Sequence, residues 1–421
     1  MPAIPVALLG YGNSARTFHI PFVKSLPGQF ELKIVLQRPR SSTSTSPDAR
    51  ADLPDVQVLP DLPAVLAAMP QGPGLVIVTT NNASHVPYAK QSLEAGKHVL
   101  IEKPVAVHER EIEELANLAR NKGLVCSVYQ NRRYDGDFLT IKSLLADSSP
   151  TNPSAIGIPT YFESRFDRFR PIAKGGWREE VDPVKEGGGM LWDLGAHLVD
   201  QVVSLFGPPS TIFGTVRNQR AQGATQVDDD WMAILTYPTM LPLPATACPA
   251  GARLGGLRVV LGSSCLSTHV DAEQFRFRVE GTAGSYVKHG TDPQEGQLKL
   301  GWTPASKGDA FGVYQDHEPA AVRLGRLTTT VQDNKPVTAA APPRLTASDI
   351  PTLPGSYISL YLNLFDAIQA ATQAAQSGQP ASDAIDSILD IQLGQVAIST
   401  RVLRLIRQSS EEGRVLAWAT A

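Results

Sequence analysis

The chain has 421 residues, of which 42% are hydrophobic and 19% charged, and its formal net charge is -3. This length allows two domains with sizeable cores. The weak net charge, without a long Lys/Arg run, excludes the electrostatic footprint of a protein that binds nucleic acid or an anionic membrane. Cys126, Cys248 and Cys265 are irregularly spaced, which indicates free thiols in a reducing compartment. The start, MPAIPVALLG, lacks a secretory signal pattern, and apolar runs stay below about 18 residues, so a cytoplasmic protein is predicted.

The first 130 residues alternate between strand and helix patterns. Short apolar runs typical of buried parallel strands occupy 4–9, 31–37, 75–80, 98–103 and 124–130. Helical stretches occupy 84–97 and 107–123, and the second has an apolar stripe ending at Gly123, a C-cap: Ile112, Leu115, Ala116 and Ala119. Repeated βαβ units predict an N-terminal Rossmann domain, 1–130, with a doubly wound parallel sheet that binds a dinucleotide.

From about residue 158 the pattern changes to strands with a period of two, at 160–169, 210–218, 230–238 and 273–281. In the last of these, opposite faces are expected for two sets: Phe275, Phe277 and Val279 on one, Arg276, Arg278 and Glu280 on the other. Pro/Ala-rich stretches at 238–252 and 335–354, and a Ser/Thr-rich stretch at 40–54, are predicted to be loops. Two closing helices are expected over about 356–407. Residues 131–421 are therefore predicted to form an α+β substrate and oligomerisation domain with a large, mostly antiparallel sheet.

The stretch LLGYGNSARTFHIPF, residues 8–22, follows the first strand and opens the first helix with G-x-G-x-x-A spacing. Gly10 permits a tight turn, Gly12 leaves room for a pyrophosphate, and Ala15 keeps the helix close to the strand. The helix N-terminus offers free N–H groups to phosphates. The segment, Asn13 included, is therefore predicted to bind a dinucleotide.

The end of the second strand distinguishes the two nicotinamide cofactors. NAD sites usually place Asp or Glu there, whereas this chain reads LQRPR, with Gln37, Arg38 and Arg40. The guanidinium of Arg38 can pair with a 2′-phosphate and stack on adenine. NADP(H) is therefore expected in preference to NAD(H); the alternative is that Arg38 is a solvated surface residue.

The segment EGGGMLWDLGAHLVDQV carries Asp193 and His197 four residues apart, on one face of a helix, beside an apolar stripe that includes Leu198 and Val202. Oxidation of an alcohol needs a base for the hydroxyl proton, and neutral imidazole is suited to that role. His197 is therefore a candidate base, with Asp193 beside it. The alternative is a histidine that only packs in the core.

Lys103 is the second candidate, because it leaves the strand HVLIEKP at the sheet edge where ligands of open α/β sheets collect. Its ammonium can stabilise a developing alkoxide or move the proton, and it can polarise the oxygen in place of a metal, so no metal is required. Glu102 is expected to orient this lysine or to lie near the nicotinamide ribose. A surface lysine at a strand end is the alternative, and which of Lys103 and His197 carries the proton is open.

Several motifs in order resemble the Gfo/Idh/MocA oxidoreductases: the glycine-rich turn, TTNNASH at 79–85, E-K-P at 102–104, YQNRR at 129–133, WDLGAHLVD and the closing helices. The Y-x-N-R-R motif is most similar to the NADP-preferring branch of sugar and polyol dehydrogenases, such as scyllo-inositol dehydrogenases. The longer stretches 238–252 and 289–345 depart from compact members, which leaves the substrate and the oligomer contacts open.

The resemblance implies further roles. It assigns Thr80, Asn81 and His85 to the neighbourhood of the cofactor, although the same residues also suit an ordinary helix start. It allows a cis bond between Lys103 and Pro104. The residues expected to contact a polyhydroxylated substrate are Asn131, Arg132, Tyr161, Arg165, Trp177 and Asp193, since aromatic rings pack on sugars and arginine holds hydroxyls.

Together these features predict an NADP(H)-dependent oxidoreductase that transfers hydride between nicotinamide and a secondary alcohol or carbonyl of a sugar, inositol or related polyol. A homo-oligomer, dimer or tetramer, is expected by analogy with the family. One alternative is a non-catalytic regulator that senses NADP on the same fold. Others are an enzyme that reduces a dicarbonyl or oxidises an aromatic diol, and a glycosidase that retains its cofactor.

Overall fold

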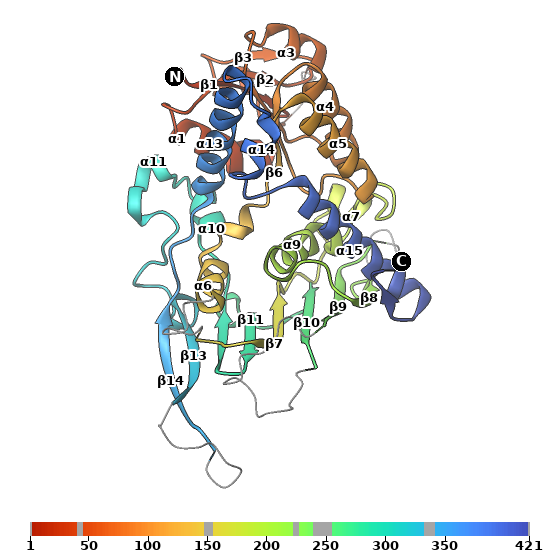
Figure 1. The fold of residues 1–421 in the computed structure, drawn as a ribbon, viewed down its shortest axis with the longest axis vertical. Helices are drawn as coiled ribbons and strands as arrows, with labels where there is room; N and C mark the ends of the chain where they lie inside the picture. Colours follow the sequence, from red (N-terminus) through yellow and green to blue (C-terminus); the bar gives the residue numbers. More distant parts are fainter. Residues whose placement is uncertain are drawn as a thin grey trace. The chain divides into compact units, whose positions relative to one another are not determined.

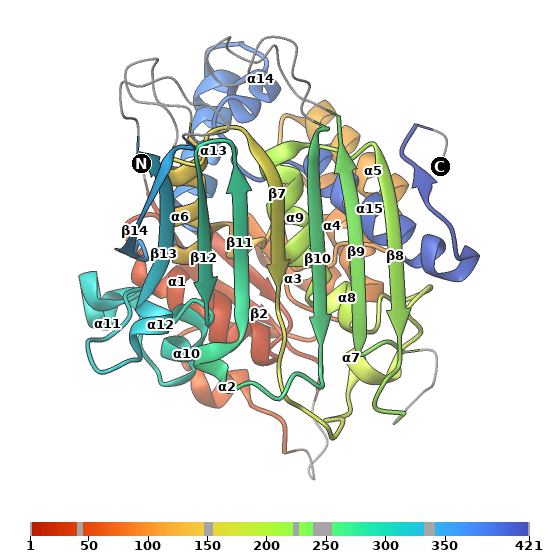
Figure 2. The ribbon, with the colours of Figure 1, turned by 90° about the horizontal axis from the view of Figure 1, so that it is seen from below.

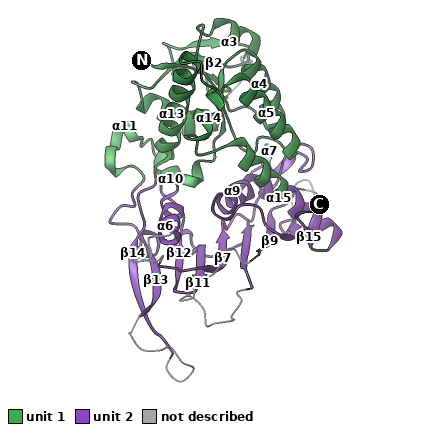
Figure 3. Ribbon diagram, viewed as in Figure 1, with its two compact units in different colours: residues 1–134, 294–312, 356–401 green, residues 135–293, 313–355, 402–421 purple. Residues whose placement is uncertain are grey.

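A computed structural model describes residues 2–39, 45–146, 155–221, 227–238, 255–331 and 342–419. The chain folds into two compact units, each built from three segments (Figure 3). Unit 1 comprises 1–134, 294–312 and 356–401, and unit 2 comprises 135–293, 313–355 and 402–421. The first boundary lies close to the predicted 130/131 division. The segments 294–312 and 356–401, expected in the second domain, belong to unit 1.

Unit 1 contains a six-stranded parallel sheet in the order β3-β2-β1-β4-β5-β6. The strands are β1 Ile4–Leu9, β2 Phe30–Leu36, β3 Gln57–Leu59, β4 Leu75–Val78, β5 His98–Ile101 and β6 Cys126–Val128. This order confirms the doubly wound Rossmann sheet, with its chain reversal between β1 and β4. The sequence did not predict β3, because three partly exposed residues are too short to show a period.

The helices of unit 1 include the two predicted at 84–97 and 107–123 and others outside that N-terminal alternation. They are η1 Ala15–His19, α1 Ile20–Ser25, α2 Ala49–Asp52, α3 Leu62–Ala68, α4 Asn82–Glu94, α5 Glu109–Lys122, η2 Asn131–Tyr134, α10 Gln294–Lys299, α11 Pro304–Lys307, η4 Gly308–Ala310, α13 Tyr357–Gln376 and α14 Ala381–Asp386. In α5, acidic residues occupy the first turn and basic ones the last, which complements the helix dipole. The helix ends at Gly123, whose φ of 63° confirms the expected C-cap.

Helix α13 belongs to unit 1 because its aromatic side chains join the core of the Rossmann domain. Tyr357 and Tyr361 are fully buried. The ring of Phe22 in α1 lies 6.3 Å from that of Tyr357 and 5.6 Å from that of Tyr361, and Phe30 in β2 lies 5.8 Å from Phe365. Aromatic burial of this kind contributes strongly to a core. The ribbon of α13 accordingly runs beside α1 and β1 (Figure 1).

Unit 2 contains a nine-stranded sheet in the order β14-β13-β12-β11-β7-β10-β9-β8-β15. The strands are β7 Pro159–Arg165, β8 Thr211–Arg217, β9 Asp230–Tyr237, β10 Leu257–Ser264, β11 Phe275–Gly281, β12 Gly284–His289, β13 Leu324–Val331, β14 Arg344–Pro351 and β15 Leu416–Ala417. Among these strands, β7 and β10 pair in parallel and the other neighbours pair antiparallel. The predicted large, mostly antiparallel sheet is therefore confirmed.

All three predicted loops lie partly outside the described residues, at 40–44, 239–252 and 335–341. The loop prediction over 335–354 was wrong at β14, where eight residues pair with β13. This strand is exposed along most of its length, so it lacks the apolar alternation by which half-buried strands are recognised.

Helices cover one face of the nine-stranded sheet. Unit 2 contains α6 Gly136–Leu145, α7 Trp177–Glu180, α8 Met190–Asp193, α9 Gly195–Phe206, η3 Asp271–Glu273, α12 Ala320–Arg323 and the second half of α15 Leu393–Glu412. The predicted second closing helix is thus two helices, α14 and α15. A side chain at Gly214 of β8 would meet Ile406 of α15, and one at Gly195 of α9 would meet Trp231 of β9. Seen from below, none of the described helices of unit 2 stands in front of the central strands of this sheet (Figure 2).

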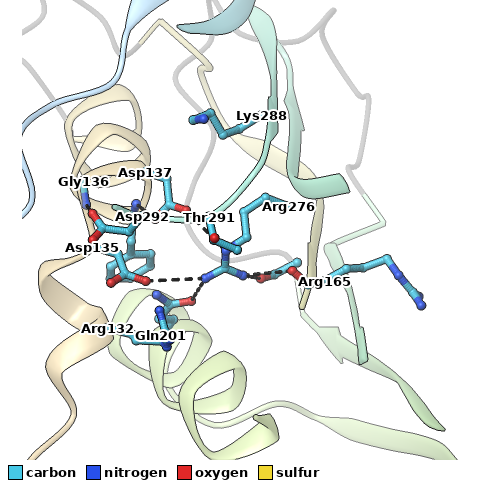
Figure 4. A network of polar contacts seen from close by, with 12 residues as sticks. Arg132, Asp135, Gly136, Asp137, Arg165, Gln201, Arg276, Lys288, Thr291 and Asp292 are labelled. Carbon is cyan, nitrogen blue, oxygen red and sulfur yellow. Dashed lines mark hydrogen bonds and ion pairs between the residues drawn. The ribbon is translucent and has the colours of Figure 1, made fainter. Parts of the chain in front are cut away.

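A bulge in β11 changes the predicted side-chain pattern. The pairing with β12 shifts between Phe275 and Phe277, and Arg276, expected on the polar face, is buried with 1% of its surface exposed. Its guanidinium lies 3.3 Å from Asp137 and donates to the hydroxyl of Ser164 at 2.9 Å (Figure 4). The expectation was wrong because the extra residue turns Arg276 inward, where ion pairing offsets the cost of burying its charge.

Candidate functional site

The glycine-rich turn combines one crowded position with one open position. Gly10 has a φ of 102°, and a Cβ there would lie 3.1 Å from the carbonyl oxygen of Thr79. A Cβ at Gly12 would meet nothing within 4 Å. Ala15 is fully buried and Asn13 is exposed. Such a turn, tight at its start and open before a helical segment, fits the pyrophosphate of a dinucleotide.

The two candidates at the end of β2 are placed differently. The amide nitrogen of Gln37 donates to Pro47 O at 2.7 Å, and its amide oxygen accepts from Ala49 N at 2.8 Å. Both ends of this side chain therefore hold the following loop. Arg38 is exposed, so its side chain is accessible to solvent, whereas Arg40 lies outside the described residues.

The loop after β4 separates residues that face outward from one that is buried. Thr80 and Asn81 are at least partly exposed, and Ser84 Oγ donates to Thr80 Oγ1 at 2.8 Å. His85 is buried, with Nδ1 2.8 Å from Pro104 O and Nε2 3.1 Å from Thr80 O. Burial lowers the pKa of His85. Its ring therefore connects two loops rather than facing a ligand.

Glu102 at the end of β5 connects three parts of unit 1. Its Oε1 accepts from the hydroxyl of Ser14 and lies 3.0 Å from His19 Nε2, and its Oε2 accepts from Lys103 N at 3.0 Å. Although burial opposes it, the hydrogen bonds from His19 and Ser14 and the charge of Lys103 lower the pKa of Glu102 to about 2. Lys103 is partly exposed, and its bond to Pro104 is cis, as the resemblance implied. The carboxylate thus fixes the main chain from which the Lys103 side chain leaves.

The sequence reasoning missed His19 and Ser14, which both contact Glu102. His19 lies among apolar neighbours in the stretch TFHIPF, a setting in which a lone histidine is usually buried and hydrogen-bonded. That signal indicates burial. It cannot name a partner that lies 83 residues further along the chain.

The YQNRR motif forms a junction within unit 1. Tyr129 packs against the ring of His19, with centroids 4.4 Å apart. Asn131 and Arg132 begin η2 and are largely buried. A nitrogen of Arg132 lies 2.5 Å from Glu295 of α10, and although burial opposes it, this pairing lowers the pKa of Glu295 to about 2. The charge of Arg132 is therefore shared with a neighbour inside the unit.

The three glycines before α8 allow it to pack closely. A Cβ at Gly188 would lie 2.2 Å from Val181 O, and one at Gly189, whose φ is 91°, would lie 2.3 Å from Asp228 Oδ1. Asp228 Oδ2 accepts from Leu191 N at 2.7 Å, which satisfies a free donor at the start of the helix. This close packing sets the position of the segment that carries Asp193.

Asp193 and His197 lie on successive short helices rather than on one. Asp193 ends α8, His197 lies in the first turn of α9, and Leu194 separates the helices. Both side chains are buried, with 8% and 6% of their surface exposed. Leu198 and Val202 are fully buried, which confirms the predicted apolar stripe. His197 belongs to unit 2 and Lys103 to unit 1.

Two predicted substrate contacts do not share a sheet face with His197. In β7, Phe162 and Ser164 are buried, and Ser164 accepts from Arg276, which also contacts Gln201 of α9. Because side chains alternate along a strand, Tyr161 and Arg165 project from the opposite face. Arg165 pairs with Asp167 at 2.6 Å and points away from the Arg276 network (Figure 4). The side chain of Trp177 lies outside the described residues.

No group of three or more His, Cys, Asp or Glu side chains among the described residues is arranged to hold a metal ion. None of the helices in the described ranges is both long and apolar enough to cross a membrane.

Comparisons with known proteins agree on one family. Residues 4–130 match the model of the oxidoreductase family with an NAD-binding Rossmann fold, and residues 151–287 match the GFO/IDH/MocA C-terminal domain. The chain is 37% identical over 372 residues to the uncharacterized oxidoreductase C26H5.09c of Schizosaccharomyces pombe, covering 88% of this chain and 91% of that one. It is 31% identical over 368 residues to scyllo-inositol 2-dehydrogenase (NADP(+)) IolW of Bacillus subtilis, covering 87% and 86%.

Solved structures show the same fold. The oxidoreductase YPO2259 of Yersinia pestis superposes with a TM-score of 0.73 at 32% identity, covering 99% of this chain and 97% of that one. The oxidoreductase yvaA of Bacillus subtilis gives a TM-score of 0.76 at 26% identity, covering 99% and 98%. The chain therefore belongs to the Gfo/Idh/MocA family of oxidoreductases, and its residues 4–130 are the NAD-binding Rossmann fold of that family.

Proposed function

We propose that the protein transfers hydride between NADP(H) and a secondary alcohol or carbonyl of a sugar, inositol or related polyol. The observation that carries this proposal is the anchoring of Lys103. Its main chain is held by Glu102, which also contacts the glycine-rich turn through Ser14, so the lysine leaves the sheet beside the segment that fits a dinucleotide. The similarity to an NADP(+)-linked scyllo-inositol dehydrogenase supports the substrate class.

The chain supplies groups for the proton, whereas the bound nicotinamide supplies the hydride donor or acceptor. Oxidation of a CH–OH group releases a hydride and a proton and leaves a carbonyl. The ammonium of Lys103 is suited to hydrogen-bond the oxygen and stabilise the alkoxide as it forms. The imidazole of His197 is the proposed base, with Asp193 on the preceding helix. Either Lys103 or His197 can then pass the proton to water.

Preference for NADP(H) rests on Arg38. The end of β2 presents this exposed guanidinium and lacks the carboxylate that would accept from a ribose 2′-hydroxyl. A guanidinium pairs with a phosphate through two parallel hydrogen bonds. Thr80 and Asn81 remain candidate cofactor contacts, and Asn131, Arg132 and Asp193 remain candidate substrate contacts.

A homo-oligomer is proposed through the open face of the nine-stranded sheet. Half-buried apolar side chains line this face on its central strands, among them Phe213, Met232, Ile234 and Val260. A contiguous apolar patch on an uncovered sheet face is typical of a protein interface. The expected result is a dimer or tetramer in light scattering; a strictly monomeric protein at micromolar concentration would reject this part.

A panel of sugars, inositols and keto-sugars, followed by the absorbance of reduced nicotinamide, tests the activity. Turnover with at least one inositol or sugar is expected, with NADPH bound at least about tenfold more tightly than NADH. Silence across the panel, with tight NADP binding retained, would indicate a regulator that senses NADP. Turnover confined to a dicarbonyl or an aromatic diol would replace the proposed substrate class.

A further inference from the structure

His19 is a buried histidine with a polar partner on each side. It ends η1, immediately after the glycine-rich turn, and its side chain has no exposed surface. Its Nδ1 lies 2.7 Å from the hydroxyl of Tyr361 in α13, and its Nε2 lies 3.0 Å from Glu102 Oε1. Three segments distant in sequence thus meet at one imidazole, within a single unit.

The partners fix the direction of these hydrogen bonds. Burial raises the pKa of Tyr361 well above its usual value, so its hydroxyl keeps the proton and can donate. A carboxylate can only accept. In neutral His19, Nδ1 therefore accepts from Tyr361 and the proton on Nε2 points at Glu102. This arrangement is a directional chain from α13 through η1 to the end of β5.

The chain ends at the carboxylate that holds the Lys103 main chain. Glu102 Oε2 accepts from Lys103 N, while Oε1 receives both His19 and the Ser14 hydroxyl of the glycine-rich turn. Rotation of this carboxylate would break the contact with the turn and the contact with the lysine loop together. A hydrogen-bond donor that prevents this rotation therefore fixes the position of the glycine-rich turn relative to the loop that carries Lys103.

We propose that His19 is a positioning residue for the hydride-transfer reaction: its Nε2–H fixes the Glu102 carboxylate, which in turn aligns the Lys103 loop with the glycine-rich turn. Tyr361 supports it by holding the tautomer that donates. The proposal rests on the proposed function in giving Lys103 a catalytic role. The contacts themselves do not depend on the substrate.

Packing alone is the competing account. The ring of His19 packs against that of Tyr129 at a tilt of 45°, and an apolar side chain of similar volume would keep much of that contact. Such a replacement would leave Glu102 without one of its donors. The two accounts therefore differ in the effect of a residue that keeps the hydrogen bond but not the ring.

The experiment compares His19→Gln with His19→Leu. The amide nitrogen of glutamine lies near the place of Nε2 and can donate to Glu102, whereas leucine cannot. We expect His19→Leu to lower kcat at least about tenfold and to change the Kd for NADPH less than about threefold, measured on protein whose thermal unfolding shows it to be folded. His19→Gln should recover most of kcat. Equal losses in the two variants would overturn the proposal.

A double-mutant cycle tests whether His19 acts through Glu102. In the Glu102→Gln background, His19→Leu should lower kcat by less than about twofold further, since the carboxylate that it positions is gone. Fully additive losses would show that His19 acts by another route.

A measurement without substrate separates this proposal from the proposed function. The charged and titratable groups around the carboxylate include His19, Lys103 and His85, with Tyr129 and Tyr361 packed on His19. Carbon-13 NMR of labelled glutamate carboxyls should show Glu102 ionised down to pH about 2 in the native protein and titrating at higher pH in His19→Leu. An unchanged titration would overturn the proposal whatever the substrate panel shows. A silent panel with a shifted titration would reject the proposed function and leave the hydrogen-bond chain standing.

Discussion

Lys103 leaves the sheet from an anchored main chain, so its substitution should affect chemistry and little else. Lys103→Met keeps the length of the side chain and removes the ammonium. We expect kcat to fall at least about 100-fold, while the Kd for NADPH changes less than about threefold. Stopped-flow or steady-state assays with a substrate from the panel measure the first, and fluorescence titration measures the second. Lys90→Met, on the exposed side of α4, is the control; unchanged activity in Lys103→Met would remove this residue from the mechanism.

Arg38 should govern the choice of nucleotide. Arg38→Ala should weaken NADPH binding about tenfold or more, or roughly 1.4 kcal/mol, and leave NADH binding nearly unchanged, because only NADPH carries the 2′-phosphate. Arg110→Ala, another exposed arginine of the same unit, should change neither affinity. Equal losses for both nucleotides would contradict the assignment of Arg38 to the phosphate.

At the scale of single residues, the sequence shows which functional groups a segment carries but not whether each side chain is accessible to a ligand. The apolar run before them predicted that Glu102 and Lys103 follow the fifth strand, and both residues come directly after β5. The sequence could not show that the Gln37 amide is used by the following loop or that His85 is enclosed by two carbonyl oxygens. Those outcomes depend on segments that approach only in the folded chain, and a sequence period does not report them.

In the turn after the first strand, we expect substitution of Gly10 to affect stability and substitution of Gly12 to affect nucleotide binding. Gly10→Ala should lower the free energy of unfolding by about 1–3 kcal/mol, because alanine must adopt a φ of 102° and approach Thr79 O at 3.1 Å. Gly12→Ala should leave that free energy within about 1 kcal/mol, since its φ is not positive and nothing lies near the new Cβ. The Gly12 variant should nevertheless bind NADPH at least about tenfold more weakly. Chemical denaturation and nucleotide titration measure the two effects; normal binding by Gly12→Ala would contradict the pyrophosphate assignment.

Among the elements, the predictions succeeded where burial imposes a period. Apolar runs between amphipathic helices identified five of the strands of the Rossmann sheet, β1, β2, β4, β5 and β6. The exposed strand β14 has no such period. The bulge at Arg276 was hidden because one inserted residue turns a single side chain to the other face without changing the composition of the strand.

For the whole molecule, the Glu102 carboxylate makes stability depend on pH. Its pKa is about 2 in the folded protein against 4.5 for the ordinary group. The unfolded chain therefore binds a proton first as the pH falls. The contribution, about 3 kcal/mol at most, is complete above pH about 4.5 and is lost as the pH falls toward 2. Glu102→Gln should flatten this part of the pH profile of unfolding, whereas Glu114→Gln, at an exposed pair, should not; matching profiles for Glu102→Gln and the native protein would contradict it.

The division of the molecule was the least accessible to sequence reasoning. A boundary near residue 130 follows from the end of the βα alternation. Membership of α13 in the first unit depends on Tyr357 and Tyr361 packing against Phe22. Contacts between aromatic residues more than 300 positions apart leave no local signal.

This three-segment construction constrains the order of events on the ribosome. The chain emerges from its N-terminus, and domains usually fold as they emerge. Here the Rossmann core stays open to solvent around Phe22 and Phe30 until the translation machinery has delivered Tyr361 and Phe365. Most strands of the nine-stranded sheet are synthesised before α13. This sheet can therefore form before the core of unit 1 is complete. Unit 1 contains the N-terminus of the chain, but its last segment, 356–401, is synthesised near the end of translation.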